Sequence, residues 1–330
     1  MSLSAPGPGS FLVVGDAFAD LSARVRRFPE EGGDAHARRI EWSSGGSAAN
    51  VAAALASLGT PVRLLARVGP DPAAIVALRA ARRAGVDLSL LQEDPGEPTG
   101  LCFVVVSEGG ERTFFSARGA NENLARPEDV VSLLGGVAGV HLSGYALVGG
   151  SREAALAVAR AARERGIPAS LDLCLPLVEA RREETLGLLP LFSVVFGNDR
   201  EVSLLAGEDA EAAARAIAAR GVEVAVAKTG EKGCVLATAE SARVVPAYPV
   251  DAVDTTACGD AFVAGFLHAR ARGAEATACG ALGNVLGALA ATAPGSGDAL
   301  PGPRAIRAFL AERAPGLLPL LSPAAEEVTT

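Results

Sequence analysis

Short apolar runs alternate with Ala- and Leu-rich stretches along most of the chain. The first run, FLVVG at residues 11–15, is short, β-branched and ended by glycine, which predicts a buried strand. NVAAALASLG at residues 50–59 predicts a helix that ends where glycine can adopt the left-handed closing conformation. The same alternation continues from residue 137 to residue 230. Strands that alternate with helices predict an α/β fold with a mainly parallel sheet and helical crossovers.

Two segments interrupt this alternation. Residues 21–42 are polar and charged, and residues 99–116 contain two β-rich runs around Gly109 and Gly110, a composition typical of a hairpin. We expect the two segments to form a small sheet separate from the main one. The whole chain, residues 1–330, is then expected to be a single α/β domain that carries this extra sheet.

Composition and charge narrow the class of protein. Hydrophobic residues make up 49% and charged residues 21% of the chain, which is typical of a globular protein. A formal net charge of -8 opposes broad electrostatic attraction to nucleic acid. The chain contains no uninterrupted apolar run of membrane-spanning length, and its first residues, MSLSAPGPGS, do not resemble a signal peptide. We therefore expect a soluble, cytoplasmic protein with no membrane or nucleic-acid partner.

Cysteine and histidine usage gives no sign of a metal or disulfide framework. The five cysteines are widely spaced without a CxxC pair, and the three histidines form no cluster with metal-ligand spacing. Packing or surface roles are the simplest interpretation of these residues.

The strongest chemical motif is DTTACGD at residues 254–260, which runs directly into an apolar-periodic helix. Small residues at Ala257, Cys258 and Gly259 allow backbone N–H groups to converge, and the helix dipole adds positive potential. This arrangement suits an anion hole for a transferring phosphoryl group. A carboxylate at Asp260 would repel a phosphate, but its presence is explained if it accepts the proton of an attacking hydroxyl. The alternative is an ordinary aspartate that favours the start of a helix.

A second motif, GGSAAN at residues 45–50, also stands at a predicted helix start. Gly45 and Gly46 allow close approach of a polar ligand, and Asn50 offers both a donor and an acceptor. The alternative is a simple helix start capped by Ser47. The spacing differs from the GxGxxG of dinucleotide-binding proteins, and the chain has no GxxxxGK[ST], which excludes a P-loop kinase.

The two motifs together resemble the signatures of the ribokinase-like (PfkB) carbohydrate kinase family. The first signature corresponds to GGSAANVAAALASLG followed by ARVGPD, from Gly45 to Asp71, and the second to DTTACGD. Ala257 replaces the usual first glycine of the second signature, and Cys258 the usual alanine. The resemblance covers essentially the whole chain. It implies a three-layer fold with a small β-sheet lid, and ATP-dependent transfer of the γ-phosphoryl group to a sugar hydroxyl with Mg²⁺.

The resemblance assigns roles on the acceptor and metal sides of the site. Asp20 matches the sugar-binding aspartate, with Asp16 as a weaker candidate beside Gly45, Gly46 and Asn50. Asn198 and Glu201 match an N-x-x-E motif that lies near magnesium and the phosphates. Asp254 corresponds to a position that helps bind a monovalent cation, K⁺, in potassium-activated relatives.

The resemblance also assigns the nucleotide side. KTGEKG at residues 228–233 matches a strand-end turn against the nucleotide, through Lys228, Gly230 and Gly233. Lys228 replaces a more usual threonine and could neutralise phosphate charge. Asn284 and Gly295 lie in a helix and turn expected beside the adenine.

The acceptor remains open at this point. A sugar or sugar derivative is favoured, and a nucleoside kinase, which would use aromatic stacking by Phe18, Trp42 or Phe115, is the main alternative. A catalytically silent sugar- or nucleotide-binding regulator is disfavoured because Asp260 is present. The family resemblance further implies a homodimer formed through the lid, with Phe103, Phe114 and Phe115 as the candidate surface.

Overall fold

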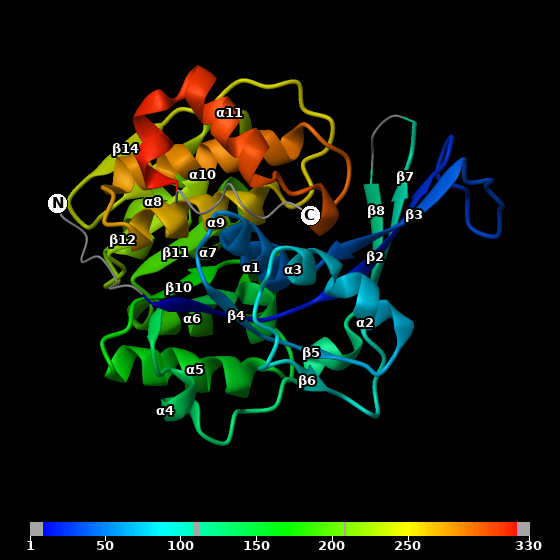
Figure 1. The fold of residues 1–330 in the computed structure, drawn as a ribbon, viewed down its shortest axis with the longest axis horizontal. Coiled ribbons are helices and arrows are strands. Elements are labelled where there is room, and N and C mark those ends of the chain that lie inside the picture. Colours follow the sequence, from blue (N-terminus) through cyan, green and yellow to red (C-terminus); the bar gives the residue numbers. More distant parts are fainter. Residues whose placement is uncertain (1–8, 109–111, 208, 322–330) are drawn as a thin grey trace.

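The computed structural model describes residues 9–108, 112–207 and 209–321, and its main part is a sheet between two layers of helices (Figure 1). Six neighbouring strands, from β12 to β4, run parallel, and the two strands at one edge each pair antiparallel with their neighbours. In spatial order the strands are β14 (Ala242–Val245), β13 (Cys234–Ala237), β12 (Val224–Lys228), β11 (Val194–Asn198), β10 (Ala169–Asp172), β9 (Val137–Ser143), β1 (Ser10–Val14) and β4 (Val62–Leu65). The predicted α/β fold with a mainly parallel sheet is confirmed.

Alternate residues of each central strand enter two separate cores. In β1, Phe11 and Val13 pack in one core, and Leu12 and Val14 pack in the other. This follows from the period of two in a strand, which points successive side chains to opposite faces.

Each core is closed by its own set of helices. The first core receives residues from α1 (Ser47–Ser57), α3 (Arg79–Arg83), α9 (Cys258–Ala271), α10 (Ala276–Ala291) and α11 (Pro303–Arg313). The second receives residues from α4 (Val130–Leu133), α5 (Arg152–Glu164), α6 (Leu175–Leu188), α7 (Asp199–Ala206) and α8 (Ala210–Ala218). The three-layer arrangement thus follows from the apolar runs of the sequence.

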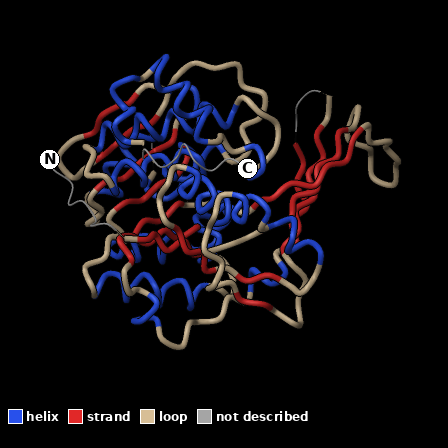
Figure 2. Tube along the Cα trace, viewed as in Figure 1, coloured by secondary structure: helices blue, strands red, loops and turns tan. Residues whose placement is uncertain are grey.

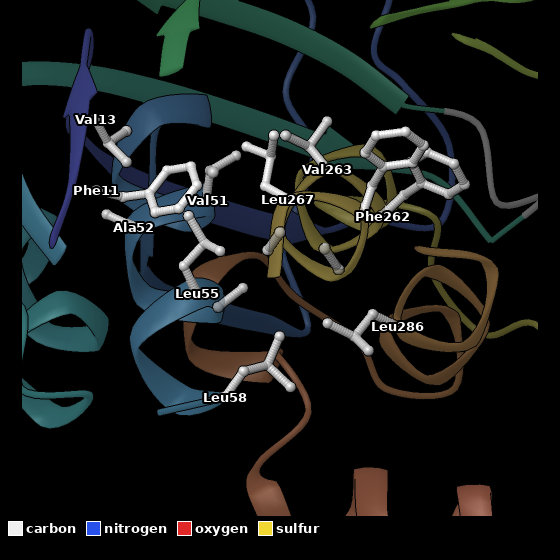
Figure 3. Packing of buried hydrophobic residues seen from close by; sticks show 14 of the residues in the cluster. Phe11, Val13, Val51, Ala52, Leu55, Leu58, Phe262, Val263, Leu267 and Leu286 are labelled. Carbon is white, nitrogen blue, oxygen red and sulfur yellow. The ribbon is translucent and has the colours of Figure 1, made fainter. Parts of the chain in front are cut away.

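Helices α1 and α9 lie side by side on the sheet (Figure 3). Val51 and Leu55 of α1 and Val263 and Leu267 of α9 fill this part of the core, and all four are buried. Buried alanines occupy most of the remaining positions of α1, which lets the helix approach its neighbours closely. Asp16 beside the start of α1 and Lys228 beside the start of α9 both lie at carboxyl ends of parallel strands. The two helices therefore begin at the same edge of the sheet.

A separate sheet projects from the main body (Figure 2). Its order is β3 (Arg39–Gly45), β2 (Phe18–Arg24), β7 (Gly100–Val106) and β8 (Arg112–Ala117), and α2 (Pro72–Ala77) packs against β2 and β3. The prediction of a separate small sheet is confirmed. Its strands begin earlier and end later than the predicted segment 21–42, so Asp20 lies within a lid strand. The predicted turn at Gly109 and Gly110 falls outside the described residues.

The register of the lid sheet places a polar row on one face and an apolar row on the other. Four paired residues on one face offer polar groups: Ser43, Asp20, Cys102 and Ser116. The next row, on the opposite face, is apolar: Trp42, Leu21, Phe103 and Phe115. The predicted dimer surface of Phe103, Phe114 and Phe115 is therefore divided between the two faces of the sheet, because Phe114 lies on the face of Asp20.

Two local sequence patterns are divided in the structure. The run PVRLLARVG at residues 61–69 is typical of a single strand, but it forms β4 and β5 (Arg67–Val68), which pairs with β6 (Gln92–Glu93). The Ala-rich segment at residues 71–85 is typical of a single helix, but it is interrupted at Leu78, between α2 and α3. Within the described ranges, no helix has the length and apolar character needed to span a bilayer. The five cysteines are free thiols.

Candidate active site

The start of α1 is built by residues that the sequence places far apart. Asp16, which follows β1, accepts hydrogen bonds from the backbone N–H groups of Ser47 (3.2 Å) and Ala48 (3.4 Å). Gly46 is the N-cap, with a φ of 92°. A Cβ atom on Gly46 would lie 2.8 Å from the backbone of Ala17, so glycine is required there. Asp16 therefore stabilises the helix start as a capping residue.

The carboxylate of Asp260 joins α9 to α1. Its Oδ1 accepts a hydrogen bond from Ser47 Oγ (2.8 Å), and its Oδ2 accepts one from Asn50 Nδ2 (2.8 Å). Among the hydrogen bonds of the described residues, none joins this carboxylate to an N–H group of its own helix. This geometry weighs against the alternative in which Asp260 only caps α9.

The surroundings of Asp260 raise its pKa to about 7. Burial is the largest cause, and the negative charge of Asp172 acts in the same direction. The hydrogen bonds from Asn50 and Ser47 and the positive charge of Lys228 oppose the rise. A carboxylate with a pKa near neutrality is well suited to accept a proton at physiological pH.

The loop before α9 has a strained backbone. Ala257, the N-cap of α9, has a φ of 58° and a ψ of 5°, and it is the one non-glycine residue of the described ranges with positive φ. An L-residue in this conformation costs roughly 1–3 kcal/mol. The carboxylate of Asp254 accepts hydrogen bonds from the N–H groups of Thr256 (2.8 Å) and Gly295 (3.1 Å) and thereby fixes the loop. The first turn of α9, with Cys258 and Gly259, follows directly.

Asp20 lies beside the same helix starts. A Cβ atom on Gly45 would be 2.3 Å from Asp20 Oδ2, so only glycine permits this approach. Burial raises the pKa of Asp20 to about 7, while a hydrogen bond with Ser296 opposes the rise. Asn50 Nδ2 also lies 3.4 Å from Ser296 Oγ. Gly45, Asn50 and Asp20 are thus brought together with Asp260, as the sequence predicts.

The turn after α10, which the sequence analysis expects beside the adenine, connects the two halves of the site through Ser296 and Asp298, and neither residue was predicted. Ser296 contacts Asn50 and Asp20, as described above. Asp298 accepts a hydrogen bond from the backbone N–H of Ser44 (2.8 Å), and its two oxygens share the Nε–H of Arg79 (3.1 and 3.2 Å). These contacts tie the lid strand β3 to the core next to the predicted acceptor residues.

The predicted N-x-x-E residues form a capping box. Asn198 Oδ1 accepts a hydrogen bond from the N–H of Glu201 (2.8 Å), and Glu201 Oε2 accepts one from the N–H of Asn198 (2.8 Å). Glu201 is only 9% exposed, and burial raises the pKa of its carboxyl. The two residues stabilise the start of α7 at the carboxyl edge of the sheet.

The remaining nucleotide-side residues are held by local contacts. Lys228 forms a buried ion pair with Asp172. Gly230 and Gly233, with φ values of 60° and 98°, shape the turn after β12. Asn284 Nδ2 donates hydrogen bonds to the carbonyl oxygens of Val245 and Pro246, both at 3.0 Å, and so ties α10 to the end of β14.

The predicted metal residues Asp254 and Glu201 do not make a preformed metal site. In the part of the chain that the structure describes, no three His, Cys, Asp or Glu side chains are grouped so as to hold a metal ion. Mg²⁺ commonly binds through one or two carboxylates together with substrate phosphates and water. The single buried carboxylate of Glu201 fits such a shared site.

Two further residues of the site were not predicted from the sequence. Asp172 ends β10, and its position at the end of a predicted strand was the available signal. Tyr145 follows β9, and its pKa is raised by burial and by neighbouring groups that include Cys174, Asp16, Glu201 and Asp260.

Comparison with known proteins places this geometry in context. The sequence profile described as pfkB family carbohydrate kinase matches residues 9–303. An ATP-dependent ribose-1-phosphate kinase from Halopiger xanaduensis is 34% identical over 302 residues, which cover 92% of this chain and 98% of that protein.

Two solved structures are also similar to this chain over most of its length. Arabidopsis thaliana ribokinase complexed with ribose and ATP is similar with a TM-score of 0.79 at 26% identity, over 92% of this chain and 98% of that one. A fructokinase double mutant from Vibrio cholerae, in a form bound to fructose, ADP and potassium ion, has a TM-score of 0.76 at 27% identity, over 93% and 99%.

The raised pKa values of Asp260 and Asp20 predict the pH dependence of activity. A base must be ionised to act, so kcat/KM for the acceptor should be highest above pH 7 and should fall as the pH drops below 7. Both carboxyls titrate near this pH, so both contribute to the acid limb. Ser47→Ala removes a hydrogen bond that lowers the pKa of Asp260, so the acid limb should move up by roughly 0.5–1 pH unit.

A matched control is available at the other end of α1. Ser57 donates its hydroxyl to Ala54 O and lies in the last turn of the helix. Ser57→Ala should leave the pH–rate profile unchanged. An acid limb at the parental position in Ser47→Ala would contradict the role given to this hydrogen bond.

Proposed function

Since the chain belongs to the pfkB family of carbohydrate kinases, we propose that it transfers the γ-phosphoryl group of ATP to a sugar hydroxyl, with Asp260 as the general base. Family membership makes it a phosphotransferase that acts on an alcohol group. The observation that carries the proposal is the position of the Asp260 carboxylate, held by Ser47 and Asn50 at the meeting point of two helix starts.

The proposed mechanism is direct in-line transfer. Asp20, Asn50 and the backbone at Gly45 and Gly46 bind and orient the acceptor, and Asp260 removes the proton from its reacting hydroxyl. The N–H groups of residues 257–260 stabilise the charge that develops on the phosphoryl oxygens. ATP supplies the phosphoryl group, and Mg²⁺ neutralises charge on its phosphates.

The nucleotide side follows from the position of the remaining predicted residues. We assign Asn198, Glu201, Lys228, the turn from Gly230 to Gly233 and the region of Asn284 to the phosphates and base of the nucleotide, and Glu201 to the magnesium. Asp254 is assigned to a monovalent cation, supported by the potassium ion bound to the Vibrio cholerae fructokinase. The whole chain, residues 1–330, is proposed to form one kinase domain with its lid in segments 21–42 and 99–116.

The lid favours a hydroxyl-rich acceptor over a nucleoside. The polar row of Ser43, Asp20, Cys102 and Ser116 faces the acceptor residues and offers hydrogen-bonding groups. Trp42 and Phe115, which a nucleoside site would use for stacking, lie on the opposite face, and Phe114 is the exposed aromatic residue on the face of Asp20. Phe18 is buried at 7% exposure. The name of the Halopiger xanaduensis relative makes ribose 1-phosphate the first phosphorylated acceptor to test.

ADP release from ATP and Mg²⁺ should be measured with ribose, ribose 1-phosphate, deoxyribose, fructose and adenosine. We expect turnover with at least one sugar or sugar phosphate and none with adenosine. Asp20→Asn should then raise the KM for that sugar by tenfold or more, since a charge-assisted hydrogen bond contributes roughly 1.5–3 kcal/mol. The KM for ATP should not change.

Ser22→Ala is the matched control, because Ser22 lies two residues further along the same face of β2. Its KM values should stay close to those of the parent protein. Turnover confined to adenosine would establish the nucleoside alternative. A higher KM for ATP in Asp20→Asn would show that Asp20 serves the nucleotide and not the sugar, which would contradict its assignment.

We further propose that two copies associate through the apolar face of the lid. Trp42 is 46% and Phe115 is 53% exposed, and Phe28 stacks on Phe115 with a ring separation of 6.4 Å. Exposed large apolar side chains gathered on one sheet face are typical of an interaction surface. A second copy can cover this face without covering the acceptor residues, which belong to the opposite face.

Phe115→Glu should convert a dimer to a monomer, because it places a charge in the apolar face. Phe114→Glu is the matched control, since Phe114 is 56% exposed but lies on the other face. Light scattering after gel filtration gives the mass of each variant. A monomeric parent protein, or equal dissociation of both variants, would contradict this assignment.

A further inference from the structure

A buried ion pair lies beneath the start of α9. Lys228 Nζ is 2.7 Å from Asp172 Oδ1 and 2.9 Å from Oδ2, and the two side chains are 14% and 6% exposed. Lys228 ends β12 and Asp172 ends β10, with β11 between them. The ion pair therefore bridges the end of the intervening strand.

The register directs both side chains toward α9. Lys228 pairs with Asn198, and Asp172 pairs with Phe196, two residues earlier on β11. All four residues consequently point to the same face of the sheet. Phe196 contacts the rings of Phe262 and Phe266, so this is the face that α9 covers.

The ammonium group lies against the first turn of α9. A Cβ atom built on Gly259 would be only 3.2 Å from Lys228 Nζ. A side chain at this position would crowd the ammonium, which explains why glycine suits residue 259. Lys228 is thus next to the N–H groups proposed to hold the transferring phosphoryl group.

The carboxylates around Lys228 keep its ammonium group charged. Burial opposes the charged form, and the positive potential of the helix start repels a cation. The negative charges of Asp172 and Glu201 outweigh burial, and the pKa of Lys228 is raised above its ordinary value. Lys228 therefore presents a positive charge beneath the start of α9, where a bound anion would add further attraction.

We propose that Asp172 is a positioning residue that holds the Lys228 ammonium beneath the first turn of α9, where its charge adds to that of the helix N–H groups in stabilising the phosphoryl group during transfer. The inference rests on the proposed function and deepens it. It adds Asp172 to the functional residues and gives Lys228 a role in the transfer step rather than in ATP binding alone.

Lys228→Met keeps the length of the side chain and removes its charge. It should lower kcat roughly 10- to 100-fold, somewhat less than the loss of a direct oxyanion donor, with little change in the KM for the sugar. Asp172→Asn should also lower kcat, because the ammonium loses its anchor. Arg220→Met is the control for the loss of a positive charge, since Arg220 is an exposed residue after α8, outside the proposed site, and should have no effect.

The pH–rate profile separates an electrostatic role from a merely structural one. Asp260 is faced by Asp172 from β10, Lys228 from β12, Tyr145 after β9, and Ser47 and Asn50 from α1. Removal of the positive charge in Lys228→Met should raise the pKa of Asp260 and move the acid limb to higher pH. Removal of the negative charge in Asp172→Asn should move the limb to lower pH, each by roughly one unit. A general loosening of the site would not produce opposite shifts.

An equilibrium measurement makes the test independent of turnover. ADP with Mg²⁺ and aluminium fluoride mimics a phosphoryl group in transfer, and calorimetry can compare its affinity with that of ADP and Mg²⁺ alone. In the parent protein aluminium fluoride should tighten binding. In the double variant Lys228→Met with Asp172→Asn, which leaves no unpaired buried charge, ADP affinity should persist while this gain falls tenfold or more.

The two proposals fail in distinguishable ways. A parent protein that phosphorylates no acceptor contradicts the proposed function. An active parent protein whose double variant retains both its kcat and its gain from aluminium fluoride contradicts the role of the ion pair. Acid limbs that do not shift in opposite directions would also overturn it.

Discussion

The close packing of α1 on α9 is the constraint on which the site depends. Buried alanines along α1 and the branched side chains between the two helices set their separation, and both helices begin at the carboxyl edge of the sheet. As a result, Ser47 and Asn50 of one helix start can hold the carboxylate of Asp260 on the other. Because Gly45 and Gly46 directly precede α1, the same packing fixes the base of the lid. A core contact thus determines where the residues proposed to bind the acceptor and the phosphoryl group meet.

Charge balance is the second feature of the site. A chain with a net charge of -8 gathers further carboxylates around Asp260, which is unfavourable for a polyphosphate ligand. The opposing potential comes from helix N–H groups and from Lys228, the cation beneath the start of α9. The local field therefore differs from the overall charge of the protein. Burial, together with neighbouring carboxylates, raises the pKa of Asp260 and Asp20 into the range where they can exchange protons near neutrality.

The sequence predicts the layers well and the contacts of the site only in part. The alternation of strands and helices is a local pattern, so it identifies the main sheet. The polar and β-rich segments that interrupt this alternation identify the lid sheet. The proximity of Asn50 to Asp260 spans 210 positions in sequence and came from the family motifs, not from spacing. Asp172 was missed because its partner lies two strands away, beyond what periodicity can reach. Ser296 was missed because its role depends on a turn whose path no pattern specifies.

The most direct test of the account is the kinetics of Asp260→Asn with a sugar that the parent protein phosphorylates. Asparagine keeps the shape of the side chain but cannot take the hydroxyl proton at neutral pH. The account predicts that kcat falls by roughly 10²–10⁴, the usual contribution of a positioned base, while ATP affinity is unchanged or slightly tighter. A kcat within a factor of about three of the parent value, in a variant folded by circular dichroism, would be the effect of losing a helix-start aspartate only. That result would contradict the assignment of Asp260 as the general base.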